Sequence, residues 1–327
     1  MAIGATALWT VAANRCELRG EALPDRAADQ VLVRTLATGV SRGTERLVLQ
    51  GRVPESQHAA MRCPLQAGDF PFPVKYGYSA VGIVEEGPEH LLGRRVFCLH
   101  PHQDRFLAPA AMCVPVPDEV PDARAVLAAN METAVNVLWD ARPLAGERAL
   151  VIGAGVVGLL VASLLARMPG MEVVVTDLDP RRRAAAEALG ARFAVPAEAP
   201  GDRDLIVHAS ADPAGLRRAL ELCAFEARIV EASWFGTREA TLPLGEAFHA
   251  KRLSIVATQV GAVAPAMRGR RTHGERMGLA LSLLADARLD ALTGPVTPFA
   301  DLAEAMPRLL DPAPGEAAPL CPVVTYA

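Results

Sequence analysis

The sequence has no excess of charge and no closely spaced cysteines. Its 37 acidic and 33 basic side chains leave a formal net charge of −4 over 327 residues. This balance gives no electrostatic reason to expect a nucleic acid or an anionic membrane as a partner. The six cysteines are scattered without a CxxC pair, so their spacing predicts neither a zinc knuckle nor a redox dithiol. Such thiols fit a reduced compartment, and we expect a cytoplasmic protein.

The sequence also lacks a convincing membrane or export segment. Residues 149–166 are uncharged and approach the ~18 apolar residues that indicate a spanning helix. Three glycines near the start of this run, and the polar strand–turn pattern that follows it, argue against a membrane interpretation. The apolar residues 1–13 have neither a basic beginning nor a convincing cleavage site. We therefore expect a strand there rather than a signal peptide.

What the sequence does contain is a strand, a glycine-rich loop, a helix and a second strand that ends in an acid. Residues 149–152 form the first apolar strand, residues 173–176 form the second, and Asp177 follows it. This arrangement is typical of a dinucleotide-binding unit. The loop residues are Gly153, Gly155, Val156, Val157 and Gly158.

Each part of this motif has a physical role. Gly153 permits a tight turn, Gly155 lets the backbone approach a pyrophosphate, and Gly158 lets helix and sheet pack closely. The start of the following helix offers N–H groups and a partial positive charge to the phosphates. A carboxylate at Asp177 accepts hydrogen bonds from the adenosine ribose hydroxyls and repels a 2′-phosphate. The motif therefore predicts NAD(H) as cofactor in preference to NADP(H).

The chain divides into a β-rich part and a part in which strands and helices alternate. Short strands between Gly, Pro and Asp turns predict a barrel with long loops. The alternation predicts a parallel sheet covered by helices on both faces. We expect an α/β protein with a β-barrel domain over residues 1–129 and 266–327, and a doubly wound nucleotide-binding domain over 130–265. The strands that mark the barrel are residues 31–36, 81–84 and 95–99.

Three further segments accompany the glycine loop in a recognisable order. They are residues 39–45 (GVSRGTE), 77–84 (GYSAVGIV) and 93–97 (GRRVF). In order and spacing they resemble the medium-chain dehydrogenase/reductase superfamily, which includes alcohol dehydrogenases and quinone reductases. The resemblance implies a GroES-like β-barrel catalytic domain, a Rossmann domain, an NAD(P)-dependent oxidoreductase acting on a small molecule, and a homodimer.

The sequence departs from this family at the positions of its zinc ligands. Zinc alcohol dehydrogenases carry Cys where this chain has Ser41, and His-Glu where it has Tyr78 and Ser79. Their third ligand would fall near residues 128–132. The four closely spaced cysteines of the structural zinc lobe are missing as well. A catalytic zinc needs about three N, S or O ligands, and hydroxyls that stay protonated at neutral pH are poor ones. We therefore expect no zinc.

A second set of metal-ligating residue types lies at residues 98–102. Cys98, His100 and His102 are spaced i, i+2 and i+4, which places them on one face if the strand continues. Such a set is typical of a soft N/S site. Pro101 interrupts the strand and no fourth ligand is evident, so cleft-lining or solvated histidines are the preferred interpretation.

Candidate catalytic residues follow from the loss of zinc. Hydride transfer needs a donor for the oxygen that develops charge. The resemblance puts the Tyr78 hydroxyl in the place of a metal ligand, where it can donate a proton, and Ser41 and Thr44 can hold the same oxygen or relay the proton. The alternative is that Tyr78 only fills space. Glu132 is a candidate acid/base or substrate-binding group, or else a carboxylate favoured by the start of a helix.

Further cofactor contacts are predicted by position. The resemblance puts Arg42 at a pyrophosphate contact, with a surface salt bridge as the alternative. It puts Thr133 near the nicotinamide and Arg182 near the adenosine ribose, although the neighbours of Arg182 leave some NADP(H) use open. Ser233 and Gln259 follow predicted strands, at the sheet edge where this fold places ligands.

Some features leave the function open. The basic cluster at residues 268–276 meets an acidic substrate, a partner subunit or only water, and a solvated loop is preferred. His208, on a predicted strand, is interpreted as a hydrogen-bonded core residue. GVSRGTE is similar to the zinc-free hydroxyethyl-chlorophyllide dehydrogenase branch, which indicates bulky substrates. We expect a zinc-independent alcohol/carbonyl oxidoreductase. The alternatives are an NADPH-dependent quinone or enone reductase and a nucleotide-binding sensor without catalysis.

Overall fold

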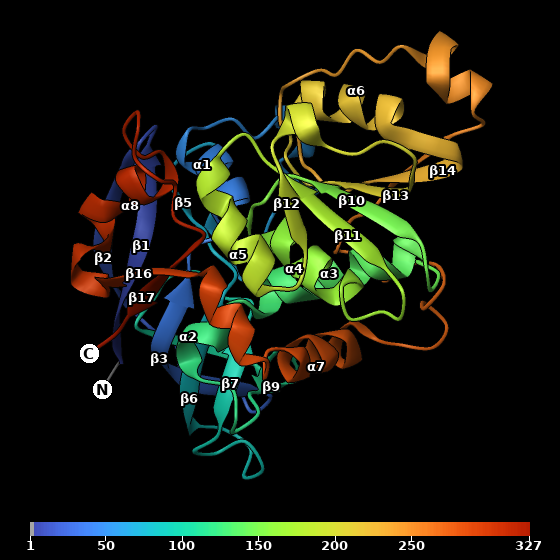
Figure 1. The fold of residues 1–327 in the computed structure, drawn as a ribbon. Coiled ribbons are helices and arrows are strands. Elements are labelled where there is room, and N and C mark those ends of the chain that lie inside the picture. Colours follow the sequence, from blue (N-terminus) through green and yellow to red (C-terminus); the bar gives the residue numbers. More distant parts are fainter. Residues whose placement is uncertain (1–2) are drawn as a thin grey trace. The chain divides into compact units, whose positions relative to one another are not determined.

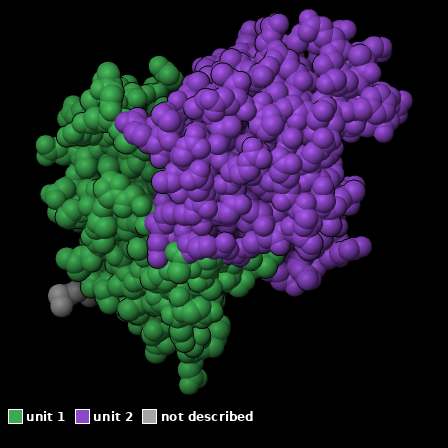
Figure 2. All heavy atoms as spheres, viewed as in Figure 1, with its two compact units in different colours: residues 1–129, 277–287, 293–327 green, residues 130–276, 288–292 purple. Residues whose placement is uncertain are grey.

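The computed structural model describes residues 3–327 and divides into two compact units (Figure 2). Unit 1 comprises residues 1–129, 277–287 and 293–327, and unit 2 comprises residues 130–276 and 288–292. The sequence-based division put residues 266–276 with the barrel, whereas the structure includes them in unit 2. The physical reason is Arg276, whose side chain binds Glu132 and Asn136 of unit 2.

Over residues 3–327, the strands of unit 1 form two sheets (Figure 1). One has the order β2-β1-β5-β4, and the other has the order β16-β17-β3-β6-β7-β9, with β8 paired to β3. The pairs are antiparallel except β16 with β17. The strands are β1 (Gly4–Ala12), β2 (Arg15–Ala22), β3 (Gln30–Gly39), β4 (Ala67–Gly68), β5 (Val74–Lys75), β6 (Ala80–Glu86), β7 (Arg95–Cys98), β8 (Arg105–Pro109), β9 (Val114–Pro115), β16 (Thr293–Pro298) and β17 (Cys321–Thr325).

The second sheet of unit 1 surrounds an apolar core. Val31 and Val33 of β3 lie on one face of the strand and pack with Val84 and Phe106. Alternate side chains of a strand point to the same face, so the predicted strand pattern at residues 31–36 produces this core. The GroES-like β-barrel domain expected from the sequence is confirmed in its fold class.

Helical segments join and cover these strands. Helix α1 follows β3, α8 precedes β17, and α7 crosses along the chain from unit 2 into unit 1. The segments are α1 (Arg42–Leu49), η1 (Glu55–Gln57), η2 (Ala110–Met112), α2 (Asp122–Ala125), α7 (His273–Leu283), η6 (Ala287–Leu292), η7 (Phe299–Asp301) and α8 (Leu302–Leu310).

Unit 2 is built on one parallel sheet, which within the described chain has six strands in the order β12-β11-β10-β13-β14-β15. This doubly wound order reverses between β10 and β13, so it confirms the predicted Rossmann fold class. The elements are α3 (Ala128–Ala141), β10 (Arg148–Ile152), α4 (Val156–Leu165), β11 (Glu172–Thr176), η3 (Pro180–Arg182), α5 (Arg183–Ala188), β12 (Arg192–Ala194), η4 (Pro196–Glu198), β13 (Arg203–His208), α6 (Pro213–Leu222), β14 (Cys223–Glu231), η5 (Leu244–Phe248) and β15 (Ser254–Ala257).

Helices cover both faces of this sheet, with α4 and α5 on one side and α6 on the other (Figure 1). Leu150 and Ile206 belong to the core cluster that includes Leu216 and Leu220 of α6. Their neighbours Val151 and Val207 are also fully buried and point to the opposite face. Burial on both faces explains why these strands are continuously apolar.

The uncharged run at residues 149–166 is therefore divided between β10, a turn and α4. Within residues 3–327, no helix combines the length and apolar character needed to cross a bilayer. The membrane interpretation of this run is wrong, because glycines break it into a strand and a short helix.

Candidate functional site

Packing alone requires two of the three loop glycines. Gly153 has φ +108°, and a Cβ there would lie 2.8 Å from the carbonyl carbon of Ala209. A Cβ on Gly158 would lie 2.0 Å from the carbonyl oxygen of Gly153. Side chains are excluded at both positions, so the loop turns sharply and α4 lies directly against it.

Gly155 differs, because nothing lies within 4 Å of the position that its Cβ would take. It is the N-cap of α4, with extended backbone and no side-chain cap. Val156 and Val157 are the first two residues of the helix, so their N–H groups have no partner within it. Open space beside these N–H groups is what an approaching phosphate requires, so the loop fits a dinucleotide.

The Asp177 carboxylate connects the end of β11 to this loop. Its Oδ2 accepts a hydrogen bond from the Ala154 N–H at 2.7 Å, and its Oδ1 accepts one from the Asp179 N–H at 2.9 Å. Leu178, the next residue, is 80% exposed. The contact from Ala154 was not predicted, because a backbone N–H leaves no signal in the sequence.

The other predicted residues of unit 2 have different surroundings. Arg182 ends η3, where its neighbour Arg181 pairs with Asp179 at 2.7 Å. Ser233 Oγ accepts a hydrogen bond from the Ala211 N–H at 3.0 Å. Gln259 is exposed beyond the end of β15. The residues at the carboxyl ends of β11, β14 and β15 therefore all lie on the edge of the sheet that also holds the glycine loop.

Glu132 and Thr133 lie on α3, where Glu132 is buried in an ion pair. Arg276 Nε donates to Glu132 Oε1 at 3.1 Å, and Arg276 Nη1 donates to Asn136 Oδ1 at 2.6 Å. Burial raises the pKa of Glu132, against the opposing effect of Arg276. Arg276 belongs to the basic cluster at residues 268–276 and is only 1% exposed. The interpretation of that cluster as a solvated loop is therefore wrong for Arg276. Thr133 is half-buried on the same helix.

In unit 1, three predicted residues come together. The Tyr78 hydroxyl donates to Ser41 Oγ at 2.6 Å and also bonds the Thr44 side chain. Burial raises the pKa of Tyr78, and the nearby Glu45 raises it further. At neutral pH the phenol is therefore protonated, and it can donate a proton.

A buried acid holds this cluster. Glu45 Oε1 accepts a hydrogen bond from the Ser41 N–H at 2.6 Å, and its Oε2 lies 3.0 Å from His102 Nε2. His102 Nδ1 lies 2.7 Å from Thr38 Oγ1, so both ring nitrogens have partners. Glu45, Thr38 and His102 were not singled out as one group in the sequence, because 64 positions separate Thr38 from His102.

The Arg42 side chain is held by hydrogen bonds to backbone carbonyl groups. Its guanidinium donates to the carbonyl oxygens of Leu309 at 3.0 Å, Leu310 at 3.1 Å and Pro319 at 3.3 Å. The first two carbonyls lie at the end of α8, where carbonyl groups need donors. Arg42 therefore fastens α1 to α8, and this conformation does not present it to a pyrophosphate.

The soft metal arrangement at residues 98–102 is not formed. His100 is buried, stacks on Phe106 at 3.8 Å, and has its pKa lowered to about 3 by burial. His102 contacts Glu45, and the free thiol of Cys98 forms a hydrogen bond with the thiol of Cys113. Both histidines are buried, so of the two alternatives, cleft-lining or solvated, the solvated one is wrong. Over residues 3–327, no group of three or more His, Cys, Asp or Glu side chains is arranged to hold a metal.

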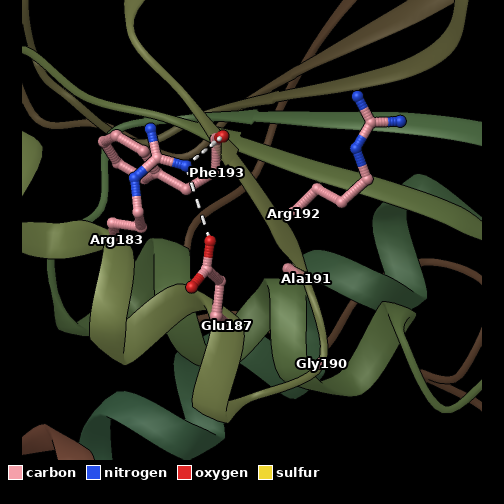
Figure 3. Close-up of a pocket in the computed structure, with 6 residues that line it drawn as sticks. All are labelled: Arg183, Glu187, Gly190, Ala191, Arg192 and Phe193. Atoms are coloured by element: carbon pink, nitrogen blue, oxygen red, sulfur yellow. Dashed lines mark hydrogen bonds and ion pairs between the residues drawn. The ribbon is translucent and has the colours of Figure 1, made fainter.

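A pocket of about 390 Å³ lies elsewhere in unit 2 (Figure 3). Arg183 Nη1 bonds Glu187 Oε1 at 3.5 Å and the Phe193 carbonyl at 3.3 Å, and its guanidinium lies 5.0 Å from the Phe193 ring. The guanidinium of Arg183, which lines the pocket, therefore already has an acidic partner, a carbonyl partner and an aromatic ring within the protein. The lining residues are Arg183, Glu187, Gly190, Ala191, Arg192 and Phe193, which include none of the predicted site residues.

The fold and the glycine loop define a Rossmann-type nucleotide-binding protein with an added barrel. Residues 156–269 match the zinc-binding dehydrogenase family. L-threonine 3-dehydrogenase of Rhizobium rhizogenes is 38% identical over 82 residues, 25% of this chain and 24% of that protein. The enzyme of the same name from Mesorhizobium japonicum is 37% identical over 93 residues, 28% and 27% of the two chains. The matching stretch thus spans about a quarter of these relatives.

Solved structures are similar over the whole chain. L-idonate 5-dehydrogenase from Escherichia coli has a TM-score of 0.81 at 17% identity, covering 100% of this chain and 99% of that one. A short chain alcohol dehydrogenase from Escherichia coli, complexed with NADH, has a TM-score of 0.79 at 18% identity and covers 99% of both chains. These likenesses establish the fold. The matches in sequence, which cover part of the chain, support its place in the medium-chain dehydrogenase/reductase superfamily.

Proposed function

We propose that the protein is a zinc-independent oxidoreductase that prefers NAD(H) and interconverts an alcohol and a carbonyl compound. The observation that carries this proposal is the open start of α4 at Gly155, next to the Asp177 carboxylate. The relatives named L-threonine 3-dehydrogenase and the NADH complex of a similar fold support it.

Unit 2 would hold the cofactor with its backbone and one acid. The N–H groups of Val156 and Val157 would bind the pyrophosphate at the start of α4, where Gly155 leaves room. Asp177 would exchange its bond from the Ala154 N–H for bonds from the ribose hydroxyls, and its charge disfavours a 2′-phosphate. The bound nicotinamide would supply or accept the hydride.

Unit 1 would supply the proton. A phenol with a raised pKa stays protonated, so Tyr78 is suited to donate to the oxygen of a carbonyl substrate. Ser41 and Thr44 bond this hydroxyl, and they would orient it and return a proton to it. Glu45 holds the backbone of Ser41 and so fixes the pair.

The side chains at the family's zinc positions do not fit that metal. Ser41 accepts a hydrogen bond from Tyr78, which is possible only while the phenol keeps its proton. A catalytic zinc needs about three donors of N, S or anionic O type, and two neutral hydroxyls supply none. This donor chemistry supports zinc independence, and no step of the proposal requires a metal.

The remaining predicted residues have lesser parts in the proposal. Glu132 would act through Arg276, which holds the loop after β15 by donating to the Val260 and Ala262 carbonyls. Thr133, Ser233 and Gln259 remain predicted cofactor contacts. Arg42 would serve the barrel, and Arg182 remains a predicted contact of the adenosine ribose.

A turnover assay with metal analysis tests the proposal. Purified protein would be given NAD⁺ with a panel of secondary alcohols that includes L-threonine and 2,3-butanediol, and NADH or NADPH with ketones and enones. We expect turnover of at least one alcohol–ketone pair with NAD(H) by protein that contains much less than one zinc per chain. Activity that depends on stoichiometric zinc contradicts the proposal. Enone reduction with NADPH alone favours the quinone reductase alternative, and NADH binding without turnover favours a sensor.

A further inference from the structure

A serine, a histidine and a glutamate form a hydrogen-bonded chain in unit 2. His208 ends β13 and Glu231 ends β14, and the two residues are paired in register across these parallel strands. Glu231 Oε2 lies 2.6 Å from His208 Nδ1, and Ser210 Oγ lies 2.7 Å from His208 Nε2. One imidazole thus binds a carboxylate through one nitrogen and a hydroxyl through the other.

Hydrogen-bond chemistry sets the proton positions in this chain. A carboxylate only accepts, so Nδ1 of His208 carries the proton that bonds Glu231. Nε2 of the neutral ring then has a free lone pair and accepts from the Ser210 hydroxyl. A hydroxyl next to a base that is oriented by an acid is the arrangement of an activated serine nucleophile.

The base and the acid are both held in place. His208 is fully buried and stacks on Phe235, with ring centroids 5.9 Å apart. The second oxygen of Glu231, Oε1, accepts from the Ser233 N–H at 2.7 Å. Ser233 Oγ also approaches His208, at 3.3 Å from Nδ1 and 3.2 Å from the carbonyl oxygen. These contacts fix the ring orientation that directs Nε2 toward Ser210.

The serine is accessible, and a glycine keeps it so. Ser210 is exposed, and a Cβ on Gly215 would lie 2.9 Å from both Ser210 Oγ and His208 Nε2. Gly215 belongs to the first turn of α6, so the positive end of that helix lies against the pair. A helix start in this position favours the negative charge that develops on a carbonyl oxygen under attack. The Asp212 N–H also donates to Ser210 Oγ, at 3.2 Å.

We propose that unit 2 carries a second active site that hydrolyses neutral carboxylic esters, with Ser210 as nucleophile, His208 as general base and Glu231 as the residue that orients it. Neutral esters are the expected class because Glu231 and Asp212 place negative charge around the serine. The inference goes beyond the oxidoreductase function and does not depend on it.

The reaction balances without any added oxidant or cofactor. Ser210 Oγ attacks the ester carbon while its proton passes to His208 Nε2, and the proton then leaves with the alcohol as the C–O bond breaks. Water next attacks the acyl carbon and gives its proton to Nε2. The acyl–serine bond breaks, Oγ recovers the proton, and a carboxylic acid is released.

The test uses p-nitrophenyl acetate and a fluorophosphonate probe on the full chain. We expect saturable release of p-nitrophenol and labelling that peptide mass spectrometry assigns to Ser210. Ser210→Ala should abolish labelling and lower kcat/KM by about 100-fold or more. Ser254→Ala removes an exposed hydroxyl at the start of β15 and should leave both readouts unchanged. Hydrolysis at the buffer rate, or equal loss in both variants, overturns the inference.

A second variant separates positioning from folding. Glu231→Gln keeps the shape of the side chain but allows the wrong ring tautomer, so kcat should fall about 10-fold or more while KM stays unchanged. An unchanged kcat contradicts the role given to Glu231. Titration with NADH keeps the two proposals apart. Ester hydrolysis without NADH binding would refute only the oxidoreductase, and NADH binding without hydrolysis would refute only the esterase.

Discussion

The two units form their candidate sites by opposite means. In unit 2 the site consists mostly of backbone, and its shape depends on the absence of side chains at Gly153, Gly155 and Gly158. In unit 1 the site consists of side-chain hydroxyls, and buried hydrogen bonds shape it, from Tyr78 to Ser41 and from Ser41 to Glu45. Added volume should therefore disrupt unit 2, whereas unit 1 should be sensitive to the loss of single polar atoms.

The two sites also differ in whether their residues are needed to form the surrounding fold. The glycine loop is part of the strand–turn–helix connection that begins the Rossmann sheet, so cofactor binding and folding use the same residues. The Tyr78 cluster instead joins side chains from separate segments of unit 1, because 37 positions separate Ser41 from Tyr78. Substitutions can test each half of this contrast.

The largest effect is expected from Gly158→Val. The new Cβ would lie 2.0 Å from the Gly153 carbonyl oxygen, so α4 must move away from the loop. We expect the free energy of unfolding to fall by about 3 kcal/mol, with loss of NADH binding. Denaturant unfolding followed by circular dichroism would measure this.

Gly155→Ala is the matched control for volume. Its Cβ meets no protein atom within 4 Å, so we expect a change in stability of less than about 0.5 kcal/mol, but weaker NADH binding. Equal destabilisation by the two variants would break the contrast between packing and binding glycines.

The next effect concerns unit 1. Tyr78→Phe removes only the hydroxyl that donates to Ser41, so we expect kcat for the best alcohol substrate to fall about 100-fold with the Kd for NADH unchanged. Tyr76 is a neighbouring buried tyrosine whose ring packs edge-on against Tyr78. The Tyr76→Phe variant lacks only the Tyr76 hydroxyl and should keep most of the activity. Similar kcat values for the two variants would show that Tyr78 only fills space.

A smaller effect is expected from the one acid of the unit 2 site. Asp177→Asn should weaken NADH binding by about 10- to 100-fold, because hydrogen bonds to a charged group contribute about 1.5–3 kcal/mol. NADPH binding should change less, so the ratio of the two Kd values should narrow. Asp179→Asn is the control, since this side chain caps η3. A ratio that Asp177→Asn leaves unchanged would remove Asp177 as the specificity residue.

The smallest effect is a pH dependence of protein stability that arises from the ion pair between Glu147 and Arg228 in unit 2. Burial raises the pKa of Glu147, but bonds from Arg228 at 2.6 and 2.8 Å and from the Leu144 N–H outweigh it, so the pKa lies below its ordinary value of 4.5. A depressed pKa adds stability above pH 4.5 that is lost as pH falls through the folded pKa.

Glu147→Gln should therefore cost about 1 kcal/mol at pH 7, and the difference from the unaltered protein should disappear in acid. Glu187→Gln breaks an exposed pair and should change stability by less than about 0.5 kcal/mol at either pH. Melting curves at pH 7 and at a series of pH values descending from 4.5 would measure both, and a difference that does not shrink as the pH falls would contradict the ionic origin.

The sequence predicted unit 2 better than unit 1, for a physical reason. A glycine loop with its strands and acid is contiguous, so local spacing contains the geometry of the site. The Glu45–His102–Thr38 contacts join residues far apart in the chain, and no local pattern marks them. Arg42 and Glu132 were predicted by position, but their partners, the α8 carbonyls and Arg276, lie 267 and 144 positions away.

Other expectations stay predictions. The homodimer, the cofactor preference and the absence of zinc were inferred from resemblance or from side-chain chemistry. Each of them depends on something outside one folded chain: a second copy, a bound nucleotide or a bound metal. The fold class was predictable because it depends only on the order of apolar strands and helices.

A fluorescence titration of the purified protein with NADH and, separately, with NADPH directly tests whether the glycine loop and Asp177 bind NAD(H). We expect saturable NADH binding and NADPH binding that is at least about 10-fold weaker, because Asp177 repels a 2′-phosphate. Binding of neither nucleotide, or equal binding of both, would contradict it.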